Sequence, residues 1–160
     1  MTARIVAEDR DYFIAHWHRT VFSVYRGVCT APHVASITAA CNSLLEKYQQ
    51  PVTYLGVIER GSPAPTEPVR RELVTWSRDV VTKIAAAVIV PEGGGFRSAM
   101  VRGVGVALTV LAPHNVPFKF AGNVVEGAQL LARFLPASAG GADQLAAAVE
   151  EARARWARNS

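Results

Sequence analysis

The sequence predicts an α/β fold, with a mixed sheet of about five strands flanked by about four helices and one more helix at the C-terminus. Two observations support this prediction. Short apolar segments typical of strands take turns with longer segments whose apolar residues recur at the three- and four-residue steps of a helix. The glycines and prolines that break chains into elements fall between these segments. Such alternation is typical of a sheet covered by helices.

The first half of the chain contains three predicted strands and two predicted helices. Each strand is short and apolar, and each helix has one apolar stripe. In order, these elements are strands Phe13–Arg19 and Val21–Val28, a helix with a stripe from Val34 to Tyr48, strand Val52–Ile58, and a helix that begins after Thr66. Thr30 and Thr66 are suitable N-caps for the two helices.

The second half continues the alternation. It contains strand Ala85–Val90, a helix over Phe96–Ala112, strand Pro117–Ala121, and a helix from Asn123 to Phe134. Residues 1–136 are therefore expected to form a single domain. Residues 137–142 are small and glycine-rich, which predicts a flexible linker. Residues 143–160 form the predicted C-terminal amphipathic helix, with the stripe Leu145, Val149, Ala152 and Trp156.

Burial is expected to be greatest on the central strands and helix stripes. We expect Val52–Ile58 and Ala85–Val90 to be neighbouring parallel strands, because a helical segment separates them. The residues predicted to be nearly fully buried are Val57, Ile58, Val88, Ile89, Val90, Leu108 and Leu131.

Composition and charge exclude several classes of protein. Half of the 160 residues are apolar and 19% are charged, which is enough apolar surface for a sizeable core. The net charge of +4 is mild and its basic residues form no run, so we expect no nucleic-acid partner. Cys29 and Cys41 make no disulfide framework, and the N-terminus is unlike a secretory signal. Because no apolar stretch has membrane length, the expected protein is cytoplasmic and binds no membrane.

The order of the elements is β-β-α-β-α-β-α-β-α, which resembles the STAS family in its stand-alone, SpoIIAA-like form, the anti-sigma-factor-antagonist type. The resemblance covers about Phe13 to Leu135. The segments that carry it are Val52–Ile58, the loop to the second helix, Val88–Val90, Phe118–Phe120 and Val124–Ala128. The resemblance implies a non-enzymatic regulatory or scaffolding domain that acts by binding a protein partner.

One loop departs from the pattern of this family. Antagonist members carry an Asp-Ser-rich phosphoacceptor loop between the third strand and the second helix. At that place this chain has Gly61–Pro68, where Ser62 and Thr66 are the only hydroxyl residues and neither has an aspartate beside it. We therefore expect Ser62 and Thr66 to remain unmodified in cells.

A glycine-rich turn offers an alternative function, the binding of an anion or small molecule. Gly93, Gly94 and Gly95 connect a predicted strand to a predicted helix, and Arg97 follows them. Free backbone N–H groups and the helix dipole favour an anion at such a place, and a guanidinium group adds a charged contact. The competing interpretation is that the glycines only permit positive φ in a tight turn.

No pattern predicts a metal, a cofactor or a catalytic centre. His16 and His18 share one face of a strand, but nothing in the sequence brings His33 or His114 to the same place. No Ser-His-Asp or Cys-His arrangement can be assembled from the spacing. An enzyme with an unrecognised site remains a third hypothesis.

Two features favour self-association, and we expect a homodimer. Gly103 and Gly105 interrupt a predicted helix that is apolar on most sides, which permits close approach of another backbone. The C-terminal helix has an apolar stripe that ends in Trp156. For the two glycines, the favoured alternative is a seam of small residues against the sheet of the same chain. The terminal stripe is compatible with packing on the same chain or on a partner.

Overall fold

The computed structural model describes residues 2–80, 83–93 and 117–159. Within them, six strands form one sheet in the order β1-β2-β3-β4-β5-β6. Their bounds are Arg4–Glu8 (β1), Tyr12–Trp17 (β2), Thr20–Tyr25 (β3), Val52–Ile58 (β4), Ile84–Pro91 (β5) and Phe118–Phe120 (β6). The predicted α/β fold with a mixed sheet is confirmed.

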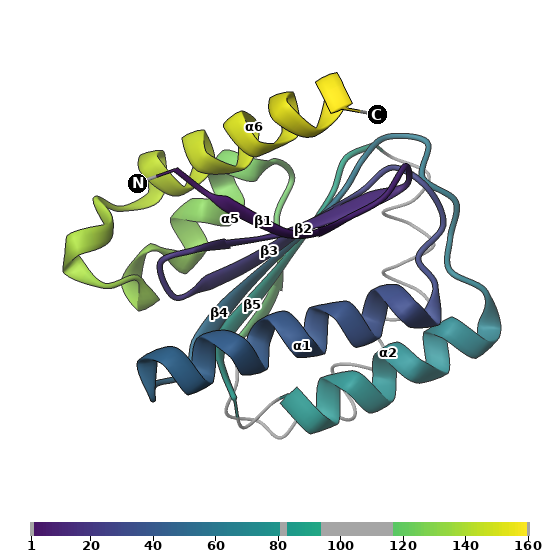
Figure 1. Ribbon diagram of the computed structural model, residues 1–160, viewed down its shortest axis with the longest axis horizontal. Coiled ribbons are helices and arrows are strands. Elements are labelled where there is room, and N and C mark those ends of the chain that lie inside the picture. The colour runs from purple at the N-terminus through teal and green to yellow at the C-terminus, as the bar shows by residue number, and fades with distance from the viewer. Residues whose placement is uncertain (1, 81–82, 94–116, 160) are drawn as a thin grey trace.

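Helices cover both faces of the sheet (Figure 1). On one face lie α1 (Ala31–Tyr48) and α2 (Glu67–Val80), and on the other lie α5 (Val124–Leu131) and α6 (Ala142–Asn159). Short 3-10 turns at Ala132–Phe134 and Ala137–Ala139 connect α5 to α6. The expected helix over Phe96–Ala112, and with it Leu108, lies outside the described residues.

The sheet changes from antiparallel to parallel at β3. Strand β2 pairs antiparallel with β1 and β3, whereas β3 with β4, β4 with β5, and β5 with β6 are parallel pairs. The prediction that Val52–Ile58 and Ala85–Val90 are neighbouring parallel strands is confirmed. The crossovers through α1 and α2 follow from this geometry, because parallel neighbours need a long connection.

The sheet separates two apolar cores. Phe13, Ala15 and Trp17 alternate with Ile14 along β2, so the first three face the core beneath α5 and α6 and Ile14 faces the core beneath α1. The core beneath α5 and α6 includes Phe13, Trp17, Phe22, Leu55, Val88, Leu131, Leu145 and Trp156. The core beneath α1 includes Ile14, Val21, Tyr25, Ile37, Cys41, Leu44 and Tyr54.

Burial follows the prediction at four of the central residues and departs from it at two. Val57, Val88, Val90 and Leu131 are at most 2% exposed. Ile58 and Ile89 are only partly buried. Both line a cavity at the ends of the strands, which explains why their side chains are less covered than their place in the sheet suggests.

Strand β1 was not predicted. Its side chains alternate between exposed and partly buried, and Arg4 and Glu8 stand at its two ends. As the outer neighbour of β2 it lies at one edge of the sheet, where charged residues discourage pairing with other chains. A bulge between Ile5 and Ala7 further breaks the alternation that identifies strands in a sequence.

The C-terminal helix packs on the sheet and is not detached from it. Residues 137–139 form a 3-10 turn in which Ala139 is fully buried, and Gly140 and Gly141 adopt positive φ before α6 begins at Ala142. The predicted stripe Leu145, Val149, Ala152 and Trp156 is at most 1% exposed. This stripe completes the core on the α5 side.

Candidate functional site at the carboxyl ends of the central strands

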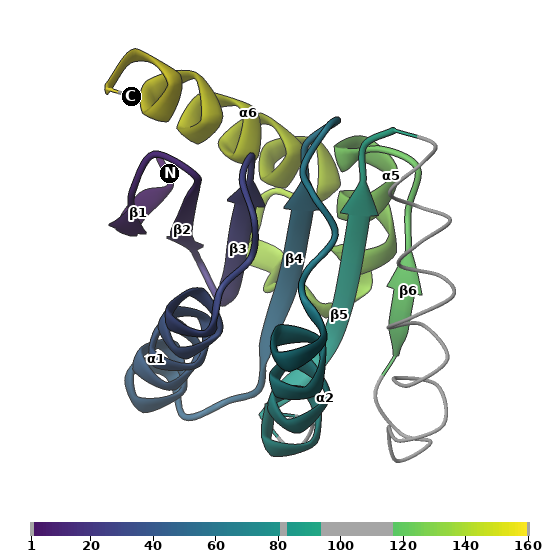
Figure 2. The same ribbon diagram turned by 90° about the vertical axis from the view of Figure 1, so that its right-hand side faces the viewer.

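The carboxyl ends of β3, β4 and β5 lie side by side at one edge of the sheet (Figure 2). They end at Tyr25, Ile58 and Pro91. In open α/β sheets, ligands bind at this edge, because the loops that leave the strands there diverge and leave space between them. The edge of this sheet carries an apolar cavity, a charged cluster and the loop that the family resemblance singles out.

The cavity lies on the α1 and α2 side of the sheet and has a volume of about 70 Å³. Its floor is formed by the ends of the strands, and its walls come from α1, α2 and the loops after β3 and β4. The described residues that line it are Tyr25, Gly27, Cys29, Ile37, Tyr54, Gly56, Ile58, Ser62, Pro63, Pro65, Leu73 and Ile89. None of these carries a charge at neutral pH.

The titratable groups of the cavity stay protonated at neutral pH. Burial raises the pKa of the Cys29 thiol to about 11, and it raises the pKa of Tyr25 and of Tyr54 well above the ordinary phenol value. The hydroxyls of Tyr54 and Ser23 are hydrogen-bonded to each other at 2.7 Å. General acid–base catalysis requires a pKa near the working pH, so these groups are poorly suited to it.

The loop after β4, residues 59–66, closes one side of the cavity and is tied to the end of β3. The Ser62 hydroxyl donates a hydrogen bond of 2.9 Å to the carbonyl oxygen of Tyr25, and the Glu59 amide donates one of 2.8 Å to the same residue. Ser62 is 6% exposed, whereas Thr66 is exposed. The Ser62 hydroxyl therefore faces the protein and is not presented to a kinase.

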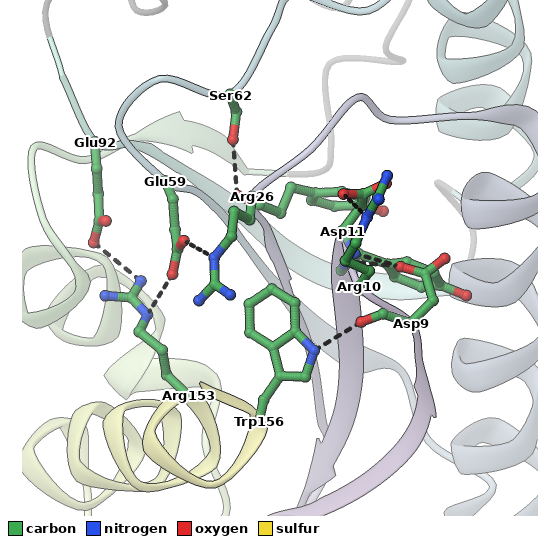
Figure 3. Close-up of polar contacts among 11 residues, drawn as sticks. Asp9, Arg10, Asp11, Arg26, Glu59, Ser62, Glu92, Arg153 and Trp156 are labelled. Carbon is green, nitrogen blue, oxygen red and sulfur yellow. Dashed lines mark hydrogen bonds and ion pairs between the residues drawn. The ribbon is translucent and has the colours of Figure 1, made fainter. Parts of the chain in front are cut away.

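A charged cluster joins α6 to the same edge of the sheet (Figure 3). Arg153 of α6 lies 3.1 Å from the carboxylate of Glu92 and 3.6 Å from that of Glu59. The Arg26 guanidinium forms a 3.0 Å ion pair with Glu59 and lies 4.1 Å from the ring centroid of Trp156. The cluster holds the ends of β3, β4 and β5 against α6.

A groove separates α1 from α2 and has a volume of about 610 Å³. Its residues are Ala31, Pro32, Val34, Ala35 and Thr38 of α1 with Arg71, Glu72, Thr75, Trp76 and Asp79 of α2. The Trp76 ring is partly exposed in the groove and packs edge-on against the buried ring of Tyr54 at 5.4 Å. Among the described residues, the groove and the cavity share no lining residue.

The glycine-rich turn proposed for anions is described only at its first residue. Gly93 has φ of +111°, the left-handed region that favours glycine, and a Cβ there would come within 3.2 Å of Arg60. Gly94, Gly95 and Arg97 lie outside the described residues. The neighbouring Glu92 is paired with Arg153. Anion binding at this turn stays a prediction.

The interface residues fall in two groups. Gly103 and Gly105 lie outside the described residues. Trp156 is 1% exposed, packs on Phe13 with 5.1 Å between ring centroids, and donates a 2.8 Å hydrogen bond to the Asp9 carbonyl. The apolar stripe of the terminal helix is therefore covered by the chain itself, and Trp156 is not exposed for a partner. The homodimer stays a prediction.

The histidines of the described part of the chain lie in separate places. His16 contacts the carbonyl of Ala40 through Nε2 at 3.1 Å, whereas His18 lies in the turn after β2. His33 caps α1, where its Nδ1 accepts a 3.1 Å hydrogen bond from the Thr30 amide. Across residues 2–80, 83–93 and 117–159, no three His, Cys, Asp or Glu side chains are grouped so as to hold a metal ion.

Sequence reasoning missed the cavity, the groove and the charged cluster. Gly56 in the middle of an otherwise apolar strand was a signal for this place, because an interior glycine often marks the close approach of other groups. The charged cluster joins residues far apart in the chain, and no local pattern announces it. None of the described helices is long and apolar enough to cross a bilayer.

The comparisons with known proteins support the fold alone. No protein-family model matches this chain, and the search of curated proteins finds no significant match. Among solved structures, the chain is similar to an uncharacterized DUF3478-family protein with a SpoIIAA-like fold from Shewanella loihica PV-4. The TM-score is 0.50 at 16% identity, and the match covers 81% of this chain and 92% of the other. The SpoIIAA-like fold expected from the order of elements is thus supported.

Proposed function

We propose that this chain is a cytoplasmic regulatory domain that acts by binding a protein partner in the groove between α1 and α2. The SpoIIAA-like fold suggests a regulatory domain in general. The observation that carries the proposal is the groove itself, which is open, large enough for several side chains, and lined by a partly exposed tryptophan.

The lining of the groove has the properties of a protein-binding site. Val34 and Trp76 supply apolar surface, and Ala35 has a side chain small enough to let a partner approach. Tryptophan is enriched among the residues that dominate binding energy, and the Tyr54 ring behind Trp76 holds it in place. The proposed site therefore resembles the grooves that accept one apolar face of an amphipathic helix.

The edges of the groove favour a partner with both signs of charge. Arg71 supplies a positive charge, and Glu72 and Asp79 supply negative ones, all on exposed positions of α2. Charges at the edge of a site mainly set partner choice and association rate, while the apolar centre supplies affinity. We therefore expect an amphipathic helix whose polar flanks carry at least one basic residue.

A capture experiment with two matched variants tests the proposal. Ala35 is exposed in the groove and Ala147 is exposed on α6, outside it. A column carrying the wild-type domain or Ala147→Arg should retain the same partner from native lysate, identified by mass spectrometry, and Ala35→Arg should lose it. Retention of that partner by Ala35→Arg would contradict binding in this groove.

A further inference from the structure

We propose that the cavity at the carboxyl ends of β3, β4 and β5 binds a small, uncharged and mostly apolar molecule that carries one hydrogen-bonding oxygen. This site differs from the groove of the proposed function, because the two share none of their described lining residues. A negative binding result at the cavity therefore leaves the proposed function of the groove unaffected, and the reverse also holds.

The size of the cavity limits the ligand. Its volume is about 70 Å³, whereas engineered apolar cavities of about 150 Å³ accept benzene. At the same ratio of volume to heavy atoms, this space holds about three carbon atoms, so one end of a four-carbon chain lies inside it and the other end reaches toward the surface. The exposed Pro63 places one end of the cavity near the protein surface, so a ligand has a route in from solvent.

The lining selects against charge. Its described members are aliphatic, aromatic, glycine, proline, cysteine and serine residues, with no lysine, arginine, aspartate or glutamate. The thiol and phenol groups of the lining stay neutral, since burial raises the pKa of each. An ion transferred into this cavity would lose its hydration, and the described lining offers no countercharge to replace it, so the lining disfavours an anion or a cation.

Tyr25 supplies a hydrogen-bonding group that the described residues leave weakly paired. The residue is 6% exposed, and among the described residues its hydroxyl makes no hydrogen bond of normal geometry, although the Cys29 thiol and the Ser23 hydroxyl interact with it. Most buried polar groups are paired, because an unpaired one forfeits the hydrogen bonds it made with water. A ligand oxygen that reaches the Tyr25 hydroxyl restores one of those bonds. The hydroxyl of Tyr54, by contrast, is already paired with Ser23.

A glycine in the central strand lets two lining side chains pack closely over the backbone. Gly56 lies between Ser23 of β3 and Ile89 of β5 in the register of the sheet. A Cβ at this position would stand 2.9 Å from Ile89 Cδ1 and 3.1 Å from the Tyr54 hydroxyl oxygen. Glycine in the interior of a strand often marks the close approach of other groups, and here a larger residue would displace Ile89 and Tyr54 and so change the shape of the cavity.

The test compares three probes that share a four-carbon chain and differ in charge. Amide chemical shifts of the ¹⁵N-labelled full chain are followed during titration with 1-butanol, sodium butyrate and butylammonium chloride. Saturable shifts at Gly27, Gly56 and Ile89 are expected with 1-butanol, and weaker or absent shifts with the two ions. Equal response to all three probes, or no saturable shift with 1-butanol, would overturn the proposal.

Two variants tie the binding to the cavity. Tyr25→Phe should weaken 1-butanol binding about fivefold, because it removes one neutral hydrogen bond. The matched change Tyr48→Phe, at the far end of α1 and outside the lining, should leave binding unchanged. Leu73→Trp fills the cavity from α2 and should abolish binding. Wild-type affinity in Leu73→Trp, checked for folding by its amide spectrum, would place the binding elsewhere.

Discussion

The Ser62 hydroxyl donates a 2.9 Å hydrogen bond to the carbonyl oxygen of Tyr25, and this bond fixes the loop after β4 on the end of β3. The same two residues line the cavity, so the bond also sets the position of one of its walls. The Ser62 hydroxyl, which lies in the loop that the family resemblance singled out, therefore makes a structural contact.

Ser62 should therefore carry no phosphate in cells. A phosphate on this 6% exposed side chain would break the hydrogen bond to Tyr25 and would place about two negative charges in an apolar wall of the cavity. Mass spectrometry of the native protein should find Ser62 unmodified, and Ser62→Ala should lower the free energy of unfolding by about 1 kcal/mol. Stoichiometric phosphate on Ser62 would contradict this account and restore the antagonist-like interpretation.

Trp156 should act on stability and not on oligomeric state. Its ring packs on Phe13 and its indole N–H donates to Asp9, so Trp156→Ala leaves a cavity between α6 and the sheet. The expected loss is about 3–5 kcal/mol in the free energy of unfolding. Urea unfolding measures this loss, and light scattering should give the same mass for both proteins. A variant of normal stability but lower mass would instead support an interface role.

Arg153 should be needed to neutralise the carboxylates at the end of the sheet. Glu59 and Glu92 have side chains only 18% and 28% exposed, so Arg153→Leu leaves them close to one another without their shared cation. We expect a loss of about 2 kcal/mol in the free energy of unfolding. The exposed Arg158 serves as control, and Arg158→Leu should cost little.

The same cluster predicts a partial rescue. In Arg153→Leu, Glu59 keeps its ion pair with Arg26, whereas Glu92 loses its cation. Adding Glu92→Gln removes that uncompensated charge and should recover part of the lost stability. If Glu92→Gln lowers the free energy of unfolding by the same amount in Arg153→Leu as in the wild type, the two residues are not coupled. The cluster then does not hold α6 to the strand ends.

His16 should make the fold less stable in mild acid. Burial is the main cause that lowers its pKa below the ordinary value of about 6.5, so the folded protein binds a proton at His16 less readily than the unfolded chain does. The stability contributed by neutral His16 is fully present above about pH 6.5 and is lost as pH falls through its folded pKa. Urea unfolding at pH 7.5 and 5.5 should show the decrease, and His16→Gln should reduce it. An unchanged decrease in His16→Gln would assign it to other groups.

The parts of the fold that the sequence predicts are those with local periodicity. The apolar segments Val52–Ile58 and Ala85–Val90 form the parallel centre of the sheet, because strands buried on both faces must be apolar throughout. Strand β1 was not predicted because an edge strand needs little apolar surface. The charged residues Arg4 and Glu8 also obscure its alternation of side chains between the two faces. The packing of α6 on the sheet was not predicted because an apolar stripe does not specify which surface covers it.

The candidate site was harder to predict, because it depends on contacts between distant segments. Ile58 and Ile89 are apolar like core residues, and only the arrangement of α1, α2 and the loops around the strand ends makes them the lining of a cavity. Arg153 meets Glu92 across 61 positions of the chain. A local pattern contains no information about such a pair.

The most direct test of the proposed function is photo-crosslinking from within the groove. A benzophenone amino acid is incorporated at position 35 or, as control, at the equally exposed position 147, and intact cells are irradiated. The account predicts one protein adduct from position 35 that is absent from position 147 and is lost when Trp76→Ala is added to a chain that still folds. An adduct that forms from position 147 and not from position 35 would contradict a partner in the α1–α2 groove.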